Sequence, residues 1–123
     1  MKIKLTSVFV NDQEKALDFY SRVFGFVKKL DITAGEFRWL TVVSPEEPDG
    51  TQLLLGPNDS PAAKTYQEAI FGQGIPAANF FVDDVQGEYE RMTKFGVKFT
   101  TKPTRVTGST IAVLDDTCGN LIQ

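Results

Sequence analysis

Two stretches of this chain read alike, and this internal repeat constrains the fold more than any other feature. Residues 7–26 read SVFVNDQEKALDFYSRVFGF, and residues 79–97 read NFFVDDVQGEYERMTKFGV. Aligned with one gap, Phe9 matches Phe81, and both copies end on a glycine-aromatic or glycine-aliphatic pair. A repeated unit of this kind is normally stabilised by packing against its own copy. The repeat therefore predicts two similar halves in a pseudo-two-fold arrangement with a cleft between them.

Each half is expected to form a strand, a helix and three further strands. In the first half, hydrophobic alternation predicts a strand, and Asn11-x-x-Glu14 is a capping box that begins a helix ending near Gly25. The second half repeats these features, with Asp83-x-x-Gln86 as the capping box. The predicted strands are residues 2–10, 26–30, 37–43 and 51–55 in the first half, and 78–82, 97–100, 109–114 and 120–123 in the second.

A connector with its own helix signals lies between the halves. Ser60 is placed as an N-cap and Pro61 as the first helical residue, and a glycine-rich run follows the helix. With 123 residues, the chain has the size of one domain. We therefore expect an α+β fold in which two βαβββ modules form a curved sheet around a cleft. The expected parts are module 1 (about 1–57), the connector (about 60–72) and module 2 (about 76–123).

The bulk properties argue against several classes of protein. The net charge is −3 and no run of Lys or Arg stands out, so nucleic-acid binding is not expected. No apolar run approaches the about 20 residues of a membrane span, and Met1 leads into a strand pattern rather than a signal peptide. The single cysteine, Cys118, excludes an internal disulfide and indicates a reducing compartment. We therefore expect a cytoplasmic protein.

The motifs of both halves resemble those of the glyoxalase/bleomycin-resistance/extradiol-dioxygenase superfamily, also called vicinal oxygen chelate. The resemblance rests on VFVND (8–12), ALDFY (16–20) and FGF (24–26), on FVDD (81–84) and GVKF (96–99), and on the closing DDTCGNLIQ (115–123). It spans essentially the whole chain. It implies the two-module fold and a homodimer, since such modules often build their cleft across a subunit interface.

The resemblance also implies where a metal would be bound. In metal-dependent members the ligands, usually His and Glu, come from the first and last strands of each module. Those positions carry Ser7, Leu54, Asn79 and Gln123 here, and the chain has no histidine. A hydroxyl and two amides are poor ligands for transition metals, and leucine is none. Asp115 and Asp116 are more simply explained by a turn. We therefore expect no metal, no cofactor and no catalytic residue of the glyoxalase or dioxygenase type.

A metal-free pocket for a small organic molecule is the favoured function. Amides and hydroxyls orient a ligand without supplying charge, and aromatic side chains suit flat ligands. Alternatively, the polar groups satisfy one another inside a closed cavity. By strand periodicity Gln52 shares a face with Leu54. The expected ligand-binding residues are Ser7, Phe9, Arg38, Trp39, Gln52, Leu54, Asn79, Phe81 and Gln123.

Arg38 and Trp39 are neighbours on one predicted strand, so their side chains point to opposite sides of the sheet. In the cleft, Arg38 would hold an anion and Trp39 would stack on a planar ligand. Alternatively, Arg38 pairs with Glu36 or another surface carboxylate. Trp39 is more simply a core residue packed under a helix. Cys118 is not expected to act as a nucleophile, because no histidine is present to activate it.

Two further functions stay open at this point. One is a metal-independent lyase or isomerase that uses Arg38 with a carboxylate such as Glu36 or Asp115. The other is a regulatory or partner-binding module whose cleft has closed.

Overall fold

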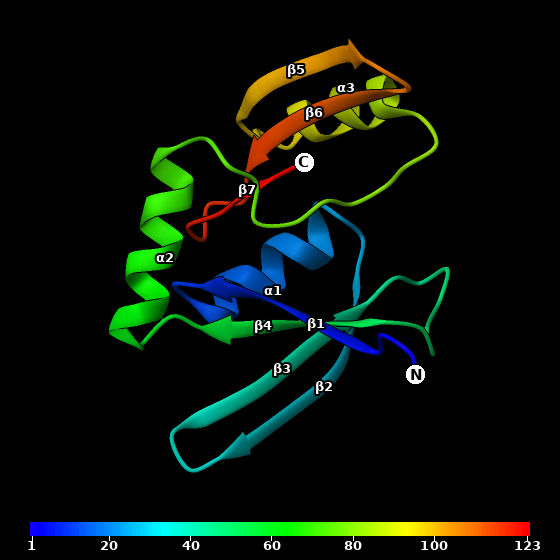
Figure 1. Ribbon diagram of the computed structural model, residues 1–123. Helices are drawn as coiled ribbons and strands as arrows, with labels where there is room; N and C mark the ends of the chain where they lie inside the picture. The colour runs from blue at the N-terminus through cyan, green and yellow to red at the C-terminus, as the bar shows by residue number, and fades with distance from the viewer.

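The computed structural model describes all residues, 1–123, and contains two β-sheets and three helices (Figure 1). The α+β class is confirmed, with two similar halves joined by α2. No helix is long and apolar enough to span a membrane. The elements in chain order are β1 (Leu5–Val10), α1 (Gln13–Arg22), β2 (Val27–Ala34), β3 (Phe37–Val43), β4 (Gln52–Pro57), α2 (Pro61–Gly72), α3 (Val85–Lys94), β5 (Phe99–Val106), β6 (Ser109–Asp115) and β7 (Leu121–Ile122).

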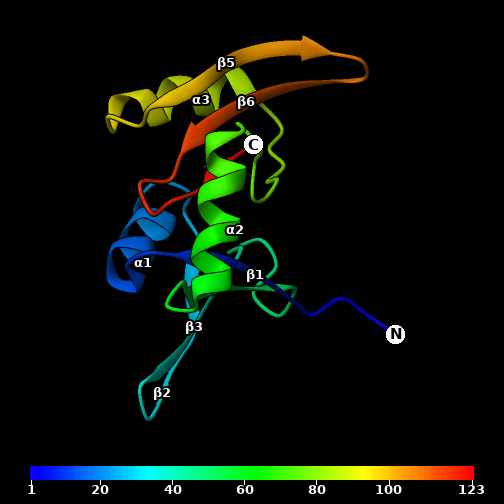
Figure 2. The same ribbon diagram turned by 60° about the vertical axis from the view of Figure 1, so that its left-hand side comes forward.

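The first half forms a four-stranded sheet in the order β1-β4-β3-β2. β1 runs parallel to β4, which places Ser7 directly beside Leu54, and the remaining pairs are antiparallel. The second half forms an antiparallel sheet in the order β5-β6-β7. α1 packs on the first sheet and α3 on the second, and both helices lie on the same side of the molecule (Figure 2).

The strand predicted for residues 78–82 is not formed, and this prediction was wrong. The segment runs parallel to β7, but only a single bridge joins Ala78 to Ile122. Its backbone bonds to the last strand are few, with Phe80 N donating to Gln123 O at 2.9 Å and Gln123 N donating to Ala78 O at 3.1 Å. A two-residue partner strand cannot pair with five residues, so Phe81 lies unpaired and 95% exposed.

Both capping boxes are displaced by one residue from their predicted places. α1 begins after Asp12, whose carboxylate accepts from Lys15 N at 3.1 Å, and α3 begins after Asp84, which accepts from Gly87 N at 2.9 Å. An aspartate at the cap supplies an acceptor and a negative charge near the positive end of the helix dipole. Its carboxylate therefore replaces the predicted Asn11 and Asp83 caps.

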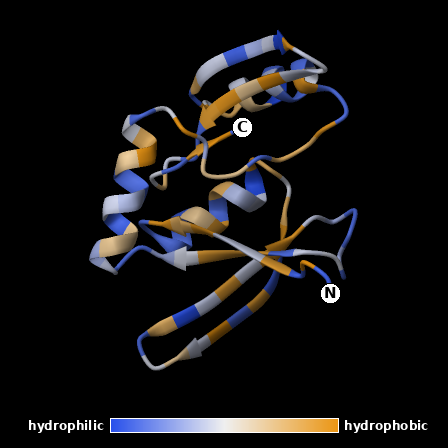
Figure 3. Ribbon diagram, in the orientation of Figure 1, coloured by the Kyte–Doolittle hydropathy of each residue, from blue (hydrophilic) through white to orange (hydrophobic).

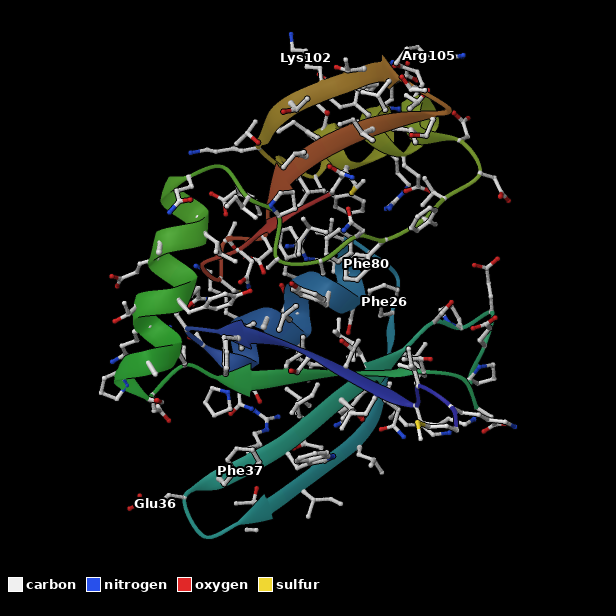
Figure 4. The ribbon with its side chains drawn as sticks, in the orientation of Figure 1. Phe26, Glu36, Phe37, Phe80, Lys102 and Arg105 are labelled. Atoms are coloured by element: carbon white, nitrogen blue, oxygen red, sulfur yellow. The ribbon has the colours of Figure 1, made fainter.

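The core is built mainly between α1 and the first sheet. Alternate residues of the strands, such as Val8, Leu40 and Leu55, are buried with Phe19 and Tyr20 of α1. An aromatic cluster then joins the two halves. The rings of Phe26 and Phe80 point toward one another between the sheets, with centroids 5.1 Å apart (Figure 4).

A fully buried carboxylate fixes the turn between β6 and β7. Asp116 accepts four hydrogen bonds, from Tyr20 Oη (2.7 Å), Cys118 N (2.7 Å), Asn120 N (2.9 Å) and Asn120 Nδ2 (2.8 Å). The first of these comes from α1 of the other half. Buried polar groups must find partners, and here the partners tie the closing turn of the second half to the core of the first.

Gln67 of α2 makes a second link between the halves. Its buried amide donates to Phe9 O at 2.8 Å in the first half and to Asn120 Oδ1 at 3.2 Å in the second. Its Oε1 accepts from Asn58 Nδ2 at 2.8 Å. The connector helix α2 is therefore held against both halves of the molecule beside the C-terminal end of β1.

Candidate functional site

The strands of the first sheet have one face turned toward α1 and one face turned away from it. Side chains alternate along a strand, and Figure 3 shows hydrophobic and hydrophilic residues alternating along β2 and β3. Since Val8, Val42 and Leu53 are in the core with α1, the residues between them face away. We call this second surface the free face; it carries Leu5, Ser7, Phe9, Leu30, Ile32, Phe37, Trp39, Thr41, Gln52 and Leu54.

The free face exposes several large apolar side chains. Leu5 is 43% exposed, Phe9 38%, Ile32 54% and Phe37 42%. Single exposed apolar residues are ordinary, whereas a contiguous apolar patch is typical of an interaction surface. Ile32 and Phe37 adjoin on β2 and β3, and Leu5 and Phe9 share β1 on the other side of β4. No helix packs on this face as α1 packs on the other.

Trp39 lies on the free face and is half-buried. Its ring is 6.2 Å from that of Phe37, at an interplanar angle of 50°. The prediction that it packs under a helix was wrong, because the helix-covered side of β3 is occupied by Leu40 and Val42. Its aromatic surface is thereby left available beside the apolar residues of β2.

Arg38 lies on the opposite side, facing α1. It donates to both carboxylate oxygens of Asp31 at 2.8 Å and also forms an ion pair with Glu14. These hydrogen bonds lower the pKa of Asp31 to about 2, and they raise the pKa of the guanidinium above its already high value. Arg38 is thus paired with surface carboxylates, as the alternative to a cleft position proposed. Its partners are Asp31 and Glu14 rather than Glu36, which lies at the tip of the β2–β3 hairpin (Figure 4).

The polar groups of the free face are few and uncharged. Thr41 Oγ1 donates to Gln52 Oε1 at 2.8 Å, which leaves the Nε2 group of Gln52 without a protein partner. The hydroxyl of Ser7 makes no hydrogen bond to the protein either, and its neighbour across the strands is the apolar Leu54. Two donors are therefore available on the face.

A small pocket of about 220 Å³ lies where the free face meets α2. Seven residues line it, and none is charged: Ser7, Val8, Phe9, Tyr66, Gln67, Ala77 and Asn120. Ser7 and Phe9 were predicted as site residues, whereas the α2 residues were not. A buried glutamine in a helix gives no sequence signal, because glutamine is usually exposed.

The second-half candidates are arranged differently. Gln123 lies beside Ala78 and Phe80 through backbone bonds, so that it flanks Asn79 as Leu54 flanks Ser7. No backbone hydrogen bond joins β1 to residues 77–82. The structure therefore brings the four positions together as two pairs, one in each half. Phe81 instead lines a separate hollow of about 400 Å³ with Glu46, Val82, Asp83, Asp84, Gly87 and Glu88.

The residues at the four metal-ligand positions do not fit a transition metal, because they offer neither imidazole nor carboxylate. The nearby carboxylates do not replace them. Asp116 is buried with four donors, and Asp115 accepts from Thr117 N at 2.7 Å. No group of three or more His, Cys, Asp and Glu residues is positioned to hold a metal ion.

Cys118 is fully buried in the turn between β6 and β7. Burial, followed by the charge of Asp116, raises the pKa of its thiol to about 12. The thiol is therefore protonated at neutral pH and has no basic partner to activate it.

Together, the fold and the free face define a class of protein with one βαβββ half, a similar half whose first strand is reduced to a single bridge, and an open, uncharged sheet surface. Residues 2–123 match the sequence model of the Glyoxalase/Bleomycin resistance protein/Dioxygenase superfamily. The chain belongs to this superfamily.

The similarity to other proteins extends over nearly the whole chain. YurT of Bacillus subtilis (strain 168), an uncharacterized protein, is 58% identical over 123 residues, which are all of this chain and 97% of YurT. The crystal structure of UcmS2 has a TM-score of 0.85 at 29% identity, covering 99% of this chain and 95% of that one. TnmS3, an antibiotic binding protein from Streptomyces sp. CB03234, has a TM-score of 0.76 at 28% identity, covering 99% and 92%.

Proposed function

We propose that this protein binds a small organic molecule on the free face, beside the pocket at α2, without a transition metal. The observation that carries this proposal is the free face itself, a sheet surface with exposed apolar side chains that carries Ser7 and Leu54 rather than metal-binding residue types. Binding by a similar protein, the antibiotic binding protein TnmS3, supports a small-molecule role at the level of the superfamily.

The ligand site is proposed to include Ser7, Phe9, Trp39, Gln52 and Leu54. These residues share one face of adjoining strands, and two of them reach the α2 pocket. The second-half residues Asn79 and Gln123 are proposed as further contacts for a ligand that extends toward the second half, whereas Phe81 is left out because it lines a separate hollow. Arg38 is left out, because it points toward α1 and is paired with two carboxylates.

A second copy of the chain is proposed to complete the site. Pockets for small molecules usually measure about 300–1,000 Å³, and the pocket of about 220 Å³ is smaller. The outer strands β2 and β5 carry bulges and basic residues, with Lys102 and Arg105 pointing outward from β5 (Figure 4). Such features oppose edge pairing at these two strands, and the free face, with its exposed apolar side chains, is proposed as the surface on which the second copy would close a homodimer.

The alternative of a metal-independent lyase or isomerase is not favoured. It needs Arg38 next to a carboxylate in the cleft, and the charges around Arg38 already neutralise one another on the α1 side. The single unpaired cysteine supports a cytoplasmic location as part of the proposal.

A thermal-shift screen of small organic compounds in the presence of a chelator tests this function, since a ligand of the folded state raises its melting temperature. Stabilising compounds are then tested on Leu54→Arg, which places a charge on the free face. Gln86→Arg, on the exposed surface of α3, is the matched control. We expect Leu54→Arg to lose the stabilisation and Gln86→Arg to keep it. Equal stabilisation of both variants would place the ligand elsewhere and contradict the proposal.

A further inference from the structure

We infer that the molecule bound on the free face is uncharged, planar and aromatic, and carries an oxygen atom that accepts hydrogen bonds. This inference rests on the proposed function and names its ligand class. It follows from three properties of the face, which are the placement of its charges, its aromatic residues and its free donors.

Of the charged residues on the four strands, Lys28, Asp31 and Arg38 lie on the α1 side, and Lys29 is paired within the protein. The four strands contain only four charged residues, which are Lys28, Lys29, Asp31 and Arg38. Asp31 forms ion pairs with Lys28 and Arg38, and Arg38 lies on the α1 side. Lys29, in the bulge of β2, pairs with Asp49. A charged ligand covered by this surface would lose its hydration without gaining a partner, which is strongly unfavourable.

The pocket at α2 continues this neutral surface. Its polar contributors are hydroxyl and amide groups, from Ser7, Tyr66, Gln67 and Asn120. The amide of Gln67 is already bonded on both its donor and acceptor sides. An ionic group of a ligand therefore finds no compensating charge here either.

Aromatic rings on the face favour a flat ligand. Trp39 and Phe37 lie together near the hairpin, and Phe9 is exposed on β1. Between these rings, the free face carries side chains that project little from the sheet. Thr41, for example, is fully buried. A planar aromatic molecule makes the largest contact with such a surface and can stack on the indole.

The free donors define the ligand's polar group. Gln52 uses its carbonyl oxygen for Thr41 and retains its NH₂ group, and Ser7 retains its hydroxyl. An oxygen that accepts hydrogen bonds, such as a carbonyl, satisfies both kinds of donor. A ligand with only donor groups would leave the NH₂ group of Gln52 without a partner.

Four bicyclic probes of similar size test the three properties: coumarin (neutral, with a carbonyl), naphthalene (neutral, without an acceptor), coumarin-3-carboxylate (anionic) and N-methylquinolinium (cationic). The chain has one tryptophan, so the indole N–H of Trp39 gives a single signal in the ¹⁵N spectrum. Its shift during each titration reports binding at the site directly. We expect coumarin to bind at least about tenfold more tightly than either charged probe, a difference of about 1.4 kcal/mol.

Two variants test the donors. Gln52→Leu and Ser7→Ala are each expected to weaken coumarin binding about fivefold, the scale of one hydrogen bond, and to leave naphthalene binding unchanged. Gln86→Leu on α3 is the control and is expected to change neither. Unfolding by urea, measured for each variant, identifies any loss of binding that comes from loss of fold.

The outcomes separate this inference from the function on which it rests. Tighter binding of a charged probe, or equal binding of coumarin and naphthalene, would overturn the ligand class while leaving small-molecule binding intact. If the Trp39 signal does not move with any of the four probes, both the ligand class and the proposed function are contradicted.

Discussion

Replacing Asp116 by alanine is expected to destabilise the protein more than almost any other single change of a polar residue. Its carboxylate is fully buried and accepts four hydrogen bonds, two from backbone N–H groups and two from side chains. One of these donors, Tyr20, belongs to the other half of the molecule. The variant therefore loosens the closing turn and a contact between the halves.

The expected cost follows from what is left unpaired. Each buried donor that loses its acceptor costs about 1 kcal/mol or more, and bonds to a charged group are the stronger ones. Partial entry of water and the lower desolvation cost of alanine offset some of this loss. We expect a decrease of about 3–5 kcal/mol in the free energy of unfolding, out of the roughly 5–15 kcal/mol of a typical domain.

Urea unfolding followed by Trp39 fluorescence measures this change, with Asp115→Ala as the control. Asp115 is the adjacent carboxylate, but it is only half-buried and accepts one bond, from Thr117 N. We expect Asp115→Ala to cost about 1 kcal/mol or less. If the two variants lose similar amounts of stability, the four-donor arrangement does not hold the halves together and the reasoning is refuted.

Three further predictions concern the same fold. Gly119→Ala should lower the free energy of unfolding by about 2–3 kcal/mol, because Gly119 has a φ of 101° and an added Cβ would lie 2.7 Å from Gln67 Nε2. Gly25→Ala should lower it by only about 1 kcal/mol, because an added Cβ there meets open space. Urea unfolding measures both changes. Because the pKa of Cys118 is raised from 9.0 to about 12 in the folded protein, the thiol ionises at lower pH in the unfolded chain than in the folded one. The free energy of unfolding should therefore decrease as the pH rises from 9.0 toward about 12, and this decrease should be smaller in Cys118→Ala. Asp31→Asn should leave coumarin binding unchanged in the Trp39 titration, because the Asp31–Arg38 pair faces α1. Weakened binding would indicate that Arg38 contributes to the ligand site.

Much of the fold could be predicted from the repeat. The strand at 37–43 follows from periodicity, and the alignment of the two halves made Ser7 equivalent to Asn79 and Leu54 equivalent to Gln123, whereas the pairing of Ser7 with Leu54 was seen only in the structure. The left-handed glycines Gly25 and Gly96, which end the helical regions, were also predicted. These features depend on local sequence patterns, and such patterns are expressed in each half separately.

Features that depend on partners elsewhere in the chain were harder to predict. The segment 78–82 has the pattern of a strand, but a strand forms only where a partner of sufficient length lies beside it, and β7 is short. The alternation of β3 showed that Arg38 and Trp39 point apart, but which of them faces α1 depends on the packing of the helix. The role of Gln67 in α2 likewise depends on carbonyl groups distant in sequence.

The central claim is that the free face binds an organic ligand without a metal. The most direct test is a coumarin titration followed by the Trp39 indole signal, performed before and after exhaustive dialysis of the protein against a chelator. The account predicts the same dissociation constant in both titrations, because neither Ser7, Leu54, Asn79 nor Gln123 offers a transition-metal ligand of ordinary strength. A loss of binding after dialysis that added Zn²⁺ or Ni²⁺ restores would contradict it.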